Sequence, residues 1–136
     1  MSNKLSKGRC QCGAVEYSIK GEIEAFFCHC EDCRLNTAAL FAAWGRVHKD
    51  AFTLLKGKLN AYNSSEGITW SSCDNCGTSI KYVNFKSRPD IDFHVATLQS
   101  DVAIQPKFHV QVKEKLPWIV IADGLPQYQR WRRDAV

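Results

Sequence analysis

The sequence lacks any run of about 18 uncharged apolar residues, the length that a membrane-spanning helix needs. Its N-terminus also lacks the apolar core of a secretory signal peptide, so we expect a cytoplasmic protein with no membrane partner. No internal repeat, low-complexity run or proline-rich linker divides the 136 residues. At 45% hydrophobic and 24% charged, the composition excludes a disordered chain. We therefore predict one globular domain over residues 1–136.

Helix signals are also scarce, and the strongest periodicity is two. Apolar and polar residues alternate over 14–20, 90–95 and 107–113, which is typical of strands with one buried face. Further strands are predicted at 22–27, 38–45, 51–55, 67–72, 77–84 and 118–122. Turn residues separate these runs, and short helical turns are expected only after Cys30 and over 125–131. The pattern predicts an all-β, mainly antiparallel fold with little helix.

Seven cysteines stand out against this background. An odd number cannot all pair as disulfides, and clustered cysteines in a reducing compartment more often bind metal. They fall into three groups, which are Cys10-x-Cys12-Gly13, Cys28-His29-Cys30-x-x-Cys33 and Cys73-x-x-Cys76-Gly77.

The first and third groups together supply four thiolates. Zinc prefers four ligands in a tetrahedron, and thiolate is among its best donors. Gly13 and Gly77 allow the backbone to fold back tightly after each pair of cysteines. The sequence predicts a closed structural zinc site at Cys10, Cys12, Cys73 and Cys76.

The second group has three thiolates and no remaining cysteine to complete it. Three protein ligands with one open position are typical of a catalytic zinc. Three thiolates also favour a soft exchangeable ligand such as a substrate thiol. We therefore predict a second zinc, two per chain in all, at Cys28, Cys30 and Cys33, where a bound thiolate could attack or leave a carbonyl carbon.

Several alternatives stay open at this point. Cys73 and Cys76 could be a redox pair, although the expected βαβ context is missing. His29 could be a fourth ligand of the second site, although on an extended segment it would point away from its neighbours. One four-cysteine zinc with three spare cysteines and an iron–sulfur cluster are the remaining possibilities.

The motifs resemble a known family. Gly8-x-Cys10-x-Cys12-Gly13, Cys28-His29-Cys30-x-x-Cys33-Arg34 and Cys73-x-x-Cys76-Gly77-Thr78 are similar to those of the glutathione-dependent formaldehyde-activating enzymes, which include the domain of centromere protein V. The likeness extends through Gly57-x-Leu59-x-x-Tyr62, Pro106-x-x-His109 and Asp123-Gly124-Leu125-Pro126, and covers about residues 8–131.

This resemblance implies a β-tent of short antiparallel sheets pinned by zinc. It implies the same division into a structural site of four cysteines and a second zinc at three, where a glutathione thiol can bind. The implied activity joins formaldehyde to glutathione and is that of a carbon–sulfur lyase. Trp70-Ser71-Ser72 stands where many members carry an arginine and an aromatic residue, so the thiol substrate stays open.

Two further residues are candidates for substrate binding. Arg34 follows Cys33, and a guanidinium can grip a carboxylate through two hydrogen bonds. His109 lies on the expected polar side of its strand and could transfer a proton or only bind a neighbouring loop. The tryptophans Trp44, Trp70 and Trp118 are expected in the core or at its rim.

The main rival function is a zinc-stabilised module that binds a protein or nucleic acid without catalysis. A net charge of +4 without interleaved aromatic residues argues against a nucleic-acid partner. A scaffold with an inactive second site is the third possibility. The sequence does not indicate an oligomeric state.

Overall fold

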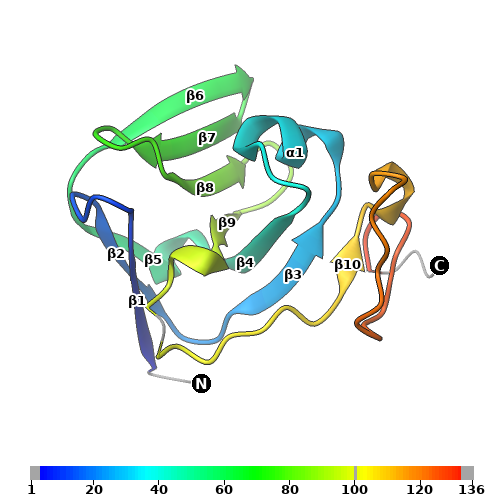
Figure 1. The fold of residues 1–136 in the computed structure, drawn as a ribbon. Coiled ribbons are helices and arrows are strands. Elements are labelled where there is room, and N and C mark those ends of the chain that lie inside the picture. The colour runs from blue at the N-terminus through cyan, green and yellow to red at the C-terminus, as the bar shows by residue number, and fades with distance from the viewer. Residues whose placement is uncertain (1–3, 100, 133–136) are drawn as a thin grey trace. The chain divides into compact units, whose positions relative to one another are not determined.

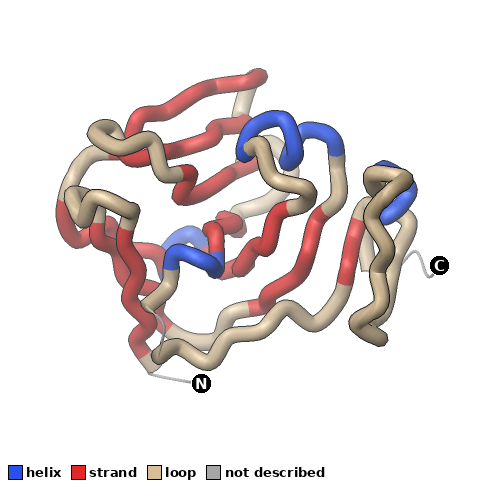
Figure 2. Tube along the Cα trace, viewed as in Figure 1, coloured by secondary structure: helices blue, strands red, loops and turns tan. Residues whose placement is uncertain are grey.

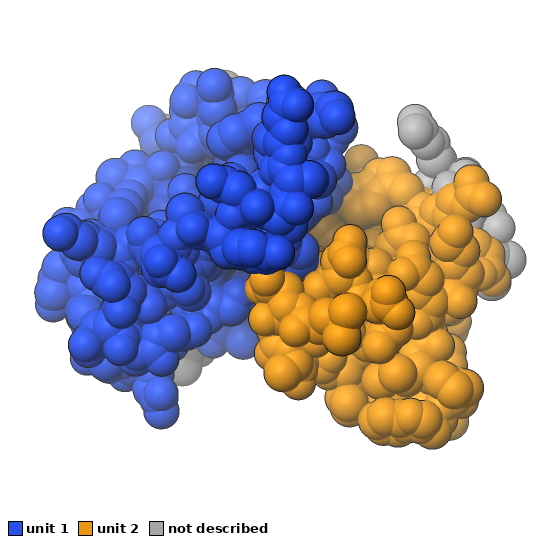
Figure 3. Space-filling view, turned by 90° about the horizontal axis from the view of Figure 1, so that it is seen from above, with its two compact units in different colours: residues 1–24, 45–104 blue, residues 25–44, 105–136 orange. Residues whose placement is uncertain are grey.

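The computed structural model describes residues 4–99 and 101–132, and the chain divides into two compact units. Residues 1–24 and 45–104 form the first unit, and residues 25–44 and 105–136 form the second (Figure 3). Each unit is therefore built from two segments that are far apart in the sequence.

The first unit contains two groups of antiparallel strands (Figure 1). One is a three-stranded sheet in the order β1-β2-β5, whose strands are β1 (Leu5–Arg9), β2 (Glu16–Lys20) and β5 (Phe52–Lys56). The other is a meander of consecutive strands, β6 (Leu59–Ser65), β7 (Ile68–Cys73), β8 (Ser79–Asn84) and β9 (Asp90–His94). Two short 3₁₀ helices, η1 (Lys49–Ala51) and η2 (Val95–Thr97), precede β5 and follow β9.

The core of the first unit joins these strands. Its buried members are Cys10, Val15, Tyr17, Ile19, Val47, Cys73, Ile80, Val83, Ile91 and Phe93. Tyr17 is fully buried between Phe52, which stacks on it, and Phe93, which meets it edge to face. Because Cys10 and Cys73 belong to this core, the sulfurs of the first cysteine pair and the third group are held by packing as well as by their loops.

Among its described residues the second unit has one α-helix, α1 (Glu31–Thr37), which His29 and Cys30 connect to β3 (Glu24–Cys28). Its short strand β10 (His109–Val110) pairs in parallel with β3, and the 3₁₀ helix η3 (Val112–Glu114) follows. Phe26 stacks on Phe108, and Trp131 meets both rings edge to face. The strand β4 (Ala42–His48) begins in this unit and ends in the first.

The predicted fold class is confirmed, because the described residues are mostly strand with antiparallel sheets and one α-helix (Figure 2). No helix within the described residues is long and apolar enough to cross a membrane. The predicted strands at 22–27, 51–55, 67–72 and 90–95 match β3, β5, β7 and β9 closely.

Other predictions were wrong in detail. Residues 118–122 form no strand, and Trp118 is 64% exposed, because Lys115 Nζ binds the carbonyls of Leu116 and Ile119 and holds this segment in a turn. The helical turn expected over 125–131 does not form, and Gln127 instead makes a parallel bridge with His109.

The predicted strand over 107–113 is only two residues long, since Gln111 adopts a left-handed conformation. His109 is also buried rather than on a polar face. The strand expected over 38–45 begins later, because α1 occupies the residues after Cys30 and ends at the left-handed Ala38.

Candidate metal centres

The first candidate centre gathers four cysteines of the first unit. Cys10 and Cys12 follow β1, while Cys73 ends β7 and Cys76 lies in the turn before β8. Tight turns bring each pair together, since the Gly13 N–H donates to the carbonyl of Cys10 at 3.2 Å and the Gly77 N–H donates to that of Cys73 at 3.0 Å. Both glycines have φ near +80°, a conformation that other residues adopt only with strain.

The sulfur spacing of this cluster fits a tetrahedral metal. All four Sγ atoms lie within 4.8 Å of one another. The Sγ atoms of Cys10 and Cys12 are 3.6 Å apart, and those of Cys12 and Cys73 are 3.9 Å apart. Ligands at about 2.3 Å from a tetrahedral metal are about 3.8 Å apart, whereas a disulfide would need about 2.05 Å. The cluster could therefore hold a metal ion.

Hydrogen-bond donors surround these sulfurs. The backbone N–H of Val15 donates to Cys10 Sγ at 3.2 Å, and the backbone N–H of Asn75 donates to Cys73 Sγ at 3.3 Å. A hydrogen bond with the Thr78 hydroxyl lowers the pKa of Cys76 to about 5. Donors of this kind favour the thiolate form, which is the form that binds metal.

The second candidate centre gathers the three cysteines of the second unit. Cys28 ends β3, Cys30 precedes α1, and Cys33 is the one buried residue of that helix. Their Sγ atoms also lie within 4.8 Å of one another. Cys30 Sγ accepts a hydrogen bond from the Cys33 N–H at 3.3 Å, so the start of the helix fixes the spacing of these two ligands.

The electrostatics of this cluster suit a bound cation. A hydrogen bond with Cys28 lowers the pKa of Cys30 to about 3, and the same hydrogen bond raises the pKa of Cys28. One thiolate is thus favoured while its neighbour keeps its proton, because adjacent negative charges repel in a partly buried site. A bound cation would allow all three to ionise, so the donor set fits a thiophilic metal.

Trp44 completes the surroundings of the second cluster. Its indole Nε1–H donates to Cys33 Sγ at 3.4 Å, and the side chain is almost fully buried. Sequence reasoning placed Trp44 in the core without a partner for its N–H group. An indole at a strand start could have been recognised as such a donor only once the fold was known.

Arg34 lies on α1 and is tied to the end of η3. Its Nη2 donates to the carbonyl of Glu114 at 3.4 Å, while its Nε is buried without a hydrogen-bond partner among the described residues. The Glu114 side chain also accepts from the backbone N–H of Glu31. Part of the guanidinium is thus used in the contact between α1 and η3.

His29 lies between two cysteines but outside the three-sulfur cluster. Its Nε2 is 2.9 Å from Nδ1 of His109, and Nε2 of His109 is 2.7 Å from Oδ2 of Asp123. Both histidines are buried, with 0% and 2% exposure. The sequence singled out His109 but not its partner Asp123, which was noted only as part of a motif.

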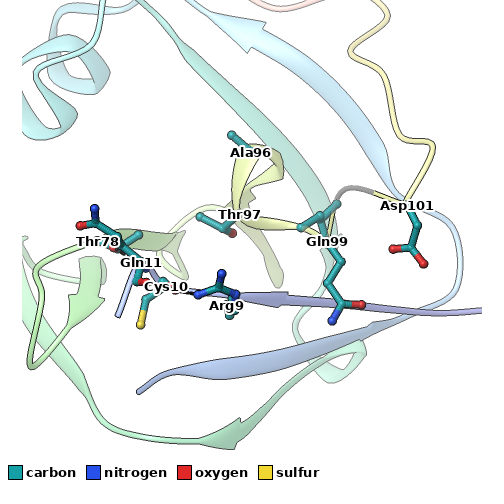
Figure 4. A pocket seen from close by; sticks show the side chains of 9 residues that line it. Arg9, Cys10, Gln11, Thr78, Ala96, Thr97, Gln99 and Asp101 are labelled. Atoms are coloured by element: carbon teal, nitrogen blue, oxygen red, sulfur yellow. Dashed lines mark hydrogen bonds between the residues drawn. The ribbon is translucent and has the colours of Figure 1, made fainter. Parts of the chain in front are cut away.

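The first unit also carries a hollow of about 790 Å³ (Figure 4). Its lining residues include Arg9, Cys10, Gln11, Thr78, Thr97 and Gln99. Arg9 Nη1 donates to the carbonyls of Cys10 and Gln11, so its guanidinium braces the loop that carries the first two cysteines. The hollow thus adjoins the four-cysteine cluster, for which the sequence predicted a structural role and no substrate.

The fold and the two clusters together define a small, mainly antiparallel β protein with two thiolate-rich candidate metal centres. The family model of the glutathione-dependent formaldehyde-activating enzyme matches residues 5–114, and the chain belongs to this family. This match confirms the resemblance found in the motifs.

A solved structure supports the fold. The chain is similar to a Rhodobacter sphaeroides protein with a TM-score of 0.58 and 24% sequence identity, over 71% of this chain and 91% of that one. At this identity the likeness concerns the fold alone. No curated protein sequence matches the chain significantly.

Proposed function

We propose that the protein is a zinc-dependent carbon–sulfur lyase that joins a small thiol, such as glutathione, to an aldehyde such as formaldehyde. The observation that carries the proposal is the three-sulfur cluster of the second unit. No fourth cysteine is left for it, because the other four cysteines form their own cluster in the first unit. Family membership supports glutathione and formaldehyde as the substrates to test first.

The proposal assigns two zinc ions to each chain. Cys10, Cys12, Cys73 and Cys76 would hold the structural ion, and Cys28, Cys30 and Cys33 would hold the second. Bound at the three-cysteine site, zinc would supply an open position that favours a substrate thiol in its thiolate form. Seven unpaired cysteines suit a reducing compartment such as the cytoplasm.

The reaction itself forms one bond and moves one proton. The thiol sulfur bonds to the carbonyl carbon, the carbon–oxygen π bond opens, and the thiol proton finishes on the new hydroxyl oxygen. The reverse reaction splits the hemithioacetal into the same two compounds. Because both directions need only correct placement and one proton transfer, the protein acts mainly by positioning.

The chain's own residues would support this placement. The Trp44 indole N–H favours the thiolate form of Cys33, and the start of α1 fixes the spacing of Cys30 and Cys33. Arg34, one residue beyond Cys33, is the candidate partner for a substrate carboxylate through the part of its guanidinium that Glu114 does not use. Both ring nitrogens of His109 already make hydrogen bonds, so we assign this residue an indirect role, through its hydrogen bond with His29.

The test measures formaldehyde loss by protein containing two zinc ions, with glutathione and with other small thiols. We expect acceleration over the uncatalysed reaction and its loss in Cys30→Ser. Leu35→Ala is the matched control, because Leu35 lies on the same helix and is 72% exposed. If the protein with two zinc ions accelerates the reaction of no thiol, the lyase proposal is wrong.

Metal counting separates the remaining alternatives. One zinc ion per chain would favour a scaffold or binding module without catalysis. Salt-dependent binding to nucleic acid by the same protein would favour a nucleic-acid module.

A further inference from the structure

We propose that Asp123 and His109 are positioning residues that act through His29 to fix the loop carrying Cys28 and Cys30. The proposal rests on the proposed function, because it assumes that this loop binds a metal. It adds a specific chain of three side chains that connects the C-terminal segment to the candidate metal centre.

The three side chains form a continuous hydrogen-bonded line within the second unit. Asp123 Oδ2 is 2.7 Å from Nε2 of His109, whose Nδ1 is 2.9 Å from Nε2 of His29. The aspartate side chain is 40% exposed, whereas His29 is fully buried. The line therefore runs from the surface to the interior of the unit.

The direction of each hydrogen bond follows from the carboxylate. An ionised carboxylate only accepts, so Nε2 of a neutral His109 must carry the hydrogen. Nδ1 of His109 then has a lone pair and accepts from the Nε2–H of His29. This order leaves Nδ1 of His29 as a bare acceptor, and that atom is buried without a partner among the described residues. Asp123 thus selects the tautomer of both rings.

His29 is fixed at three points. Its backbone N–H donates to the carbonyl of Val110 at 3.1 Å, and its ring packs against Phe41 with centroids 4.7 Å apart. The hydrogen bond to His109 adds the third contact and sets the rotation of the ring. His109 is itself stacked on Phe27, with centroids 4.8 Å apart.

Fixing His29 also fixes its two neighbours. Cys28 ends a strand and Cys30 has extended backbone angles, with φ −66° and ψ 152°. Side chains alternate along an extended chain, so His29 points away from the face that carries both thiols. A ring held on one face therefore limits the movement of the two sulfurs on the other.

The test uses variants that keep the packing but remove the hydrogen bonds. His109→Phe keeps an aromatic ring between its neighbours, and Asp123→Ala removes the acceptor at a position that is 40% exposed. Asp50→Ala is the matched control, because the Asp50 side chain is 82% exposed. Metal content and competition with a chromophoric chelator report the affinity of each of the two sites.

We expect the first two variants to bind the second ion about 10- to 100-fold more weakly, the usual effect of losing an outer-shell partner. The first ion should be unaffected, and Co²⁺ at the second site should show an altered thiolate charge-transfer spectrum. Nitrogen NMR of the histidine rings should show His29 as the Nε2–H tautomer in the unaltered protein and a changed tautomer in Asp123→Ala.

The outcomes separate this proposal from the proposed function. Two ions bound with equal affinity and identical spectra in all variants would overturn the positioning role. If the unaltered protein binds only one ion, the proposed function fails instead. In that case the NMR readout decides, and an unchanged His29 tautomer in Asp123→Ala overturns the inference.

Discussion

The indole nitrogen of Trp44 donates a hydrogen bond to the sulfur of Cys33 across 3.4 Å. The two residues are eleven positions apart, and the contact joins the start of β4 to α1. A buried N–H directed at sulfur stabilises the thiolate form, which is the form that binds metal.

Replacing this indole tests the contact directly. Trp44→Phe keeps a large aromatic ring but removes the donor, so we expect about tenfold weaker binding of the second metal ion. Chelator competition measures this effect. Trp118→Phe serves as the control because Trp118 is 64% exposed and should show no change. Equal affinity in Trp44→Phe would mean that the hydrogen bond has no role in metal binding.

Removing metal from the four-cysteine cluster should unfold the first unit. Cys10 and Cys73 are core residues, so four uncompensated thiols would be left in and beside that core. We expect Cys73→Ser to lose one zinc ion and its cooperative thermal transition, as structural zinc sites contribute folding energy. Cys30→Ser should lose one ion yet keep the transition. An unchanged melting temperature in Cys73→Ser would contradict a structural role.

A buried carboxylate between two arginines should be important for stability. Asp92 is 5% exposed at its side chain and accepts from Arg46 at 2.8 Å and 3.1 Å and from Arg88 at 2.8 Å. Asp92→Ala leaves the guanidinium groups without this partner, so we expect a loss of about 3–5 kcal/mol in the free energy of unfolding. Urea denaturation measures it. Asp50→Ala should change the value by less than about 0.5 kcal/mol.

The protein should lose stability as the solution becomes mildly acidic. Burial lowers the pKa of His94 to about 4, from 6.5. Between these two values the unfolded chain binds a proton that the folded chain does not. The contribution of His94 to the free energy of unfolding is therefore fully present above pH 6.5 and is lost as the pH decreases towards 4. The linkage predicts a loss of up to about 2 kcal/mol at pH 5 from this group.

His94→Gln isolates that contribution. Glutamine can keep the hydrogen bond that His94 makes with Ser79 Oγ at 2.9 Å, but it does not titrate. Urea midpoints at pH 7 and pH 5 should therefore differ less in His94→Gln than in the unaltered protein. An equal pH dependence in both proteins would show that His94 contributes nothing to it.

The cysteine clusters were predictable because most of their information is local. Ligands two or three residues apart reveal a metal loop without knowledge of the fold, and glycines at turns reinforce the pattern. The pairing of Cys10 with Cys73 required only that four thiolates suit one tetrahedral ion. The strand β9 was predictable for the same reason, because its apolar and polar residues alternate locally in the sequence.

Two strands were missed because their residues do not alternate in polarity. All residues of β6 except Leu59 are exposed, so the strand shows no apolar face and was not among the predicted strands. β1 buries Gly8, which approaches the ring of Tyr17 too closely for any side chain. A pattern-based prediction detects buried side chains, and neither strand offers an apolar stripe.

The partner of His109 was missed because the contact is not local. Asp123 is 14 residues from His109, and His109 is 80 residues from His29. No periodicity connects such positions. The parallel pairing of β10 with β3 brings His109 beside His29, which directly follows β3.

The four-cysteine centre also closes a long loop in the chain. Cys12 and Cys73 are 61 residues apart, and all three cysteines of the other cluster lie between them. A crosslink across a loop of that length restricts the unfolded chain by about 4 kcal/mol of conformational entropy in the usual loop-closure model. A metal ion that binds these four cysteines while the chain is still unfolded would thus reduce the conformations that β3 and α1 sample before they fold. The four-cysteine centre would then fill before the three-cysteine centre.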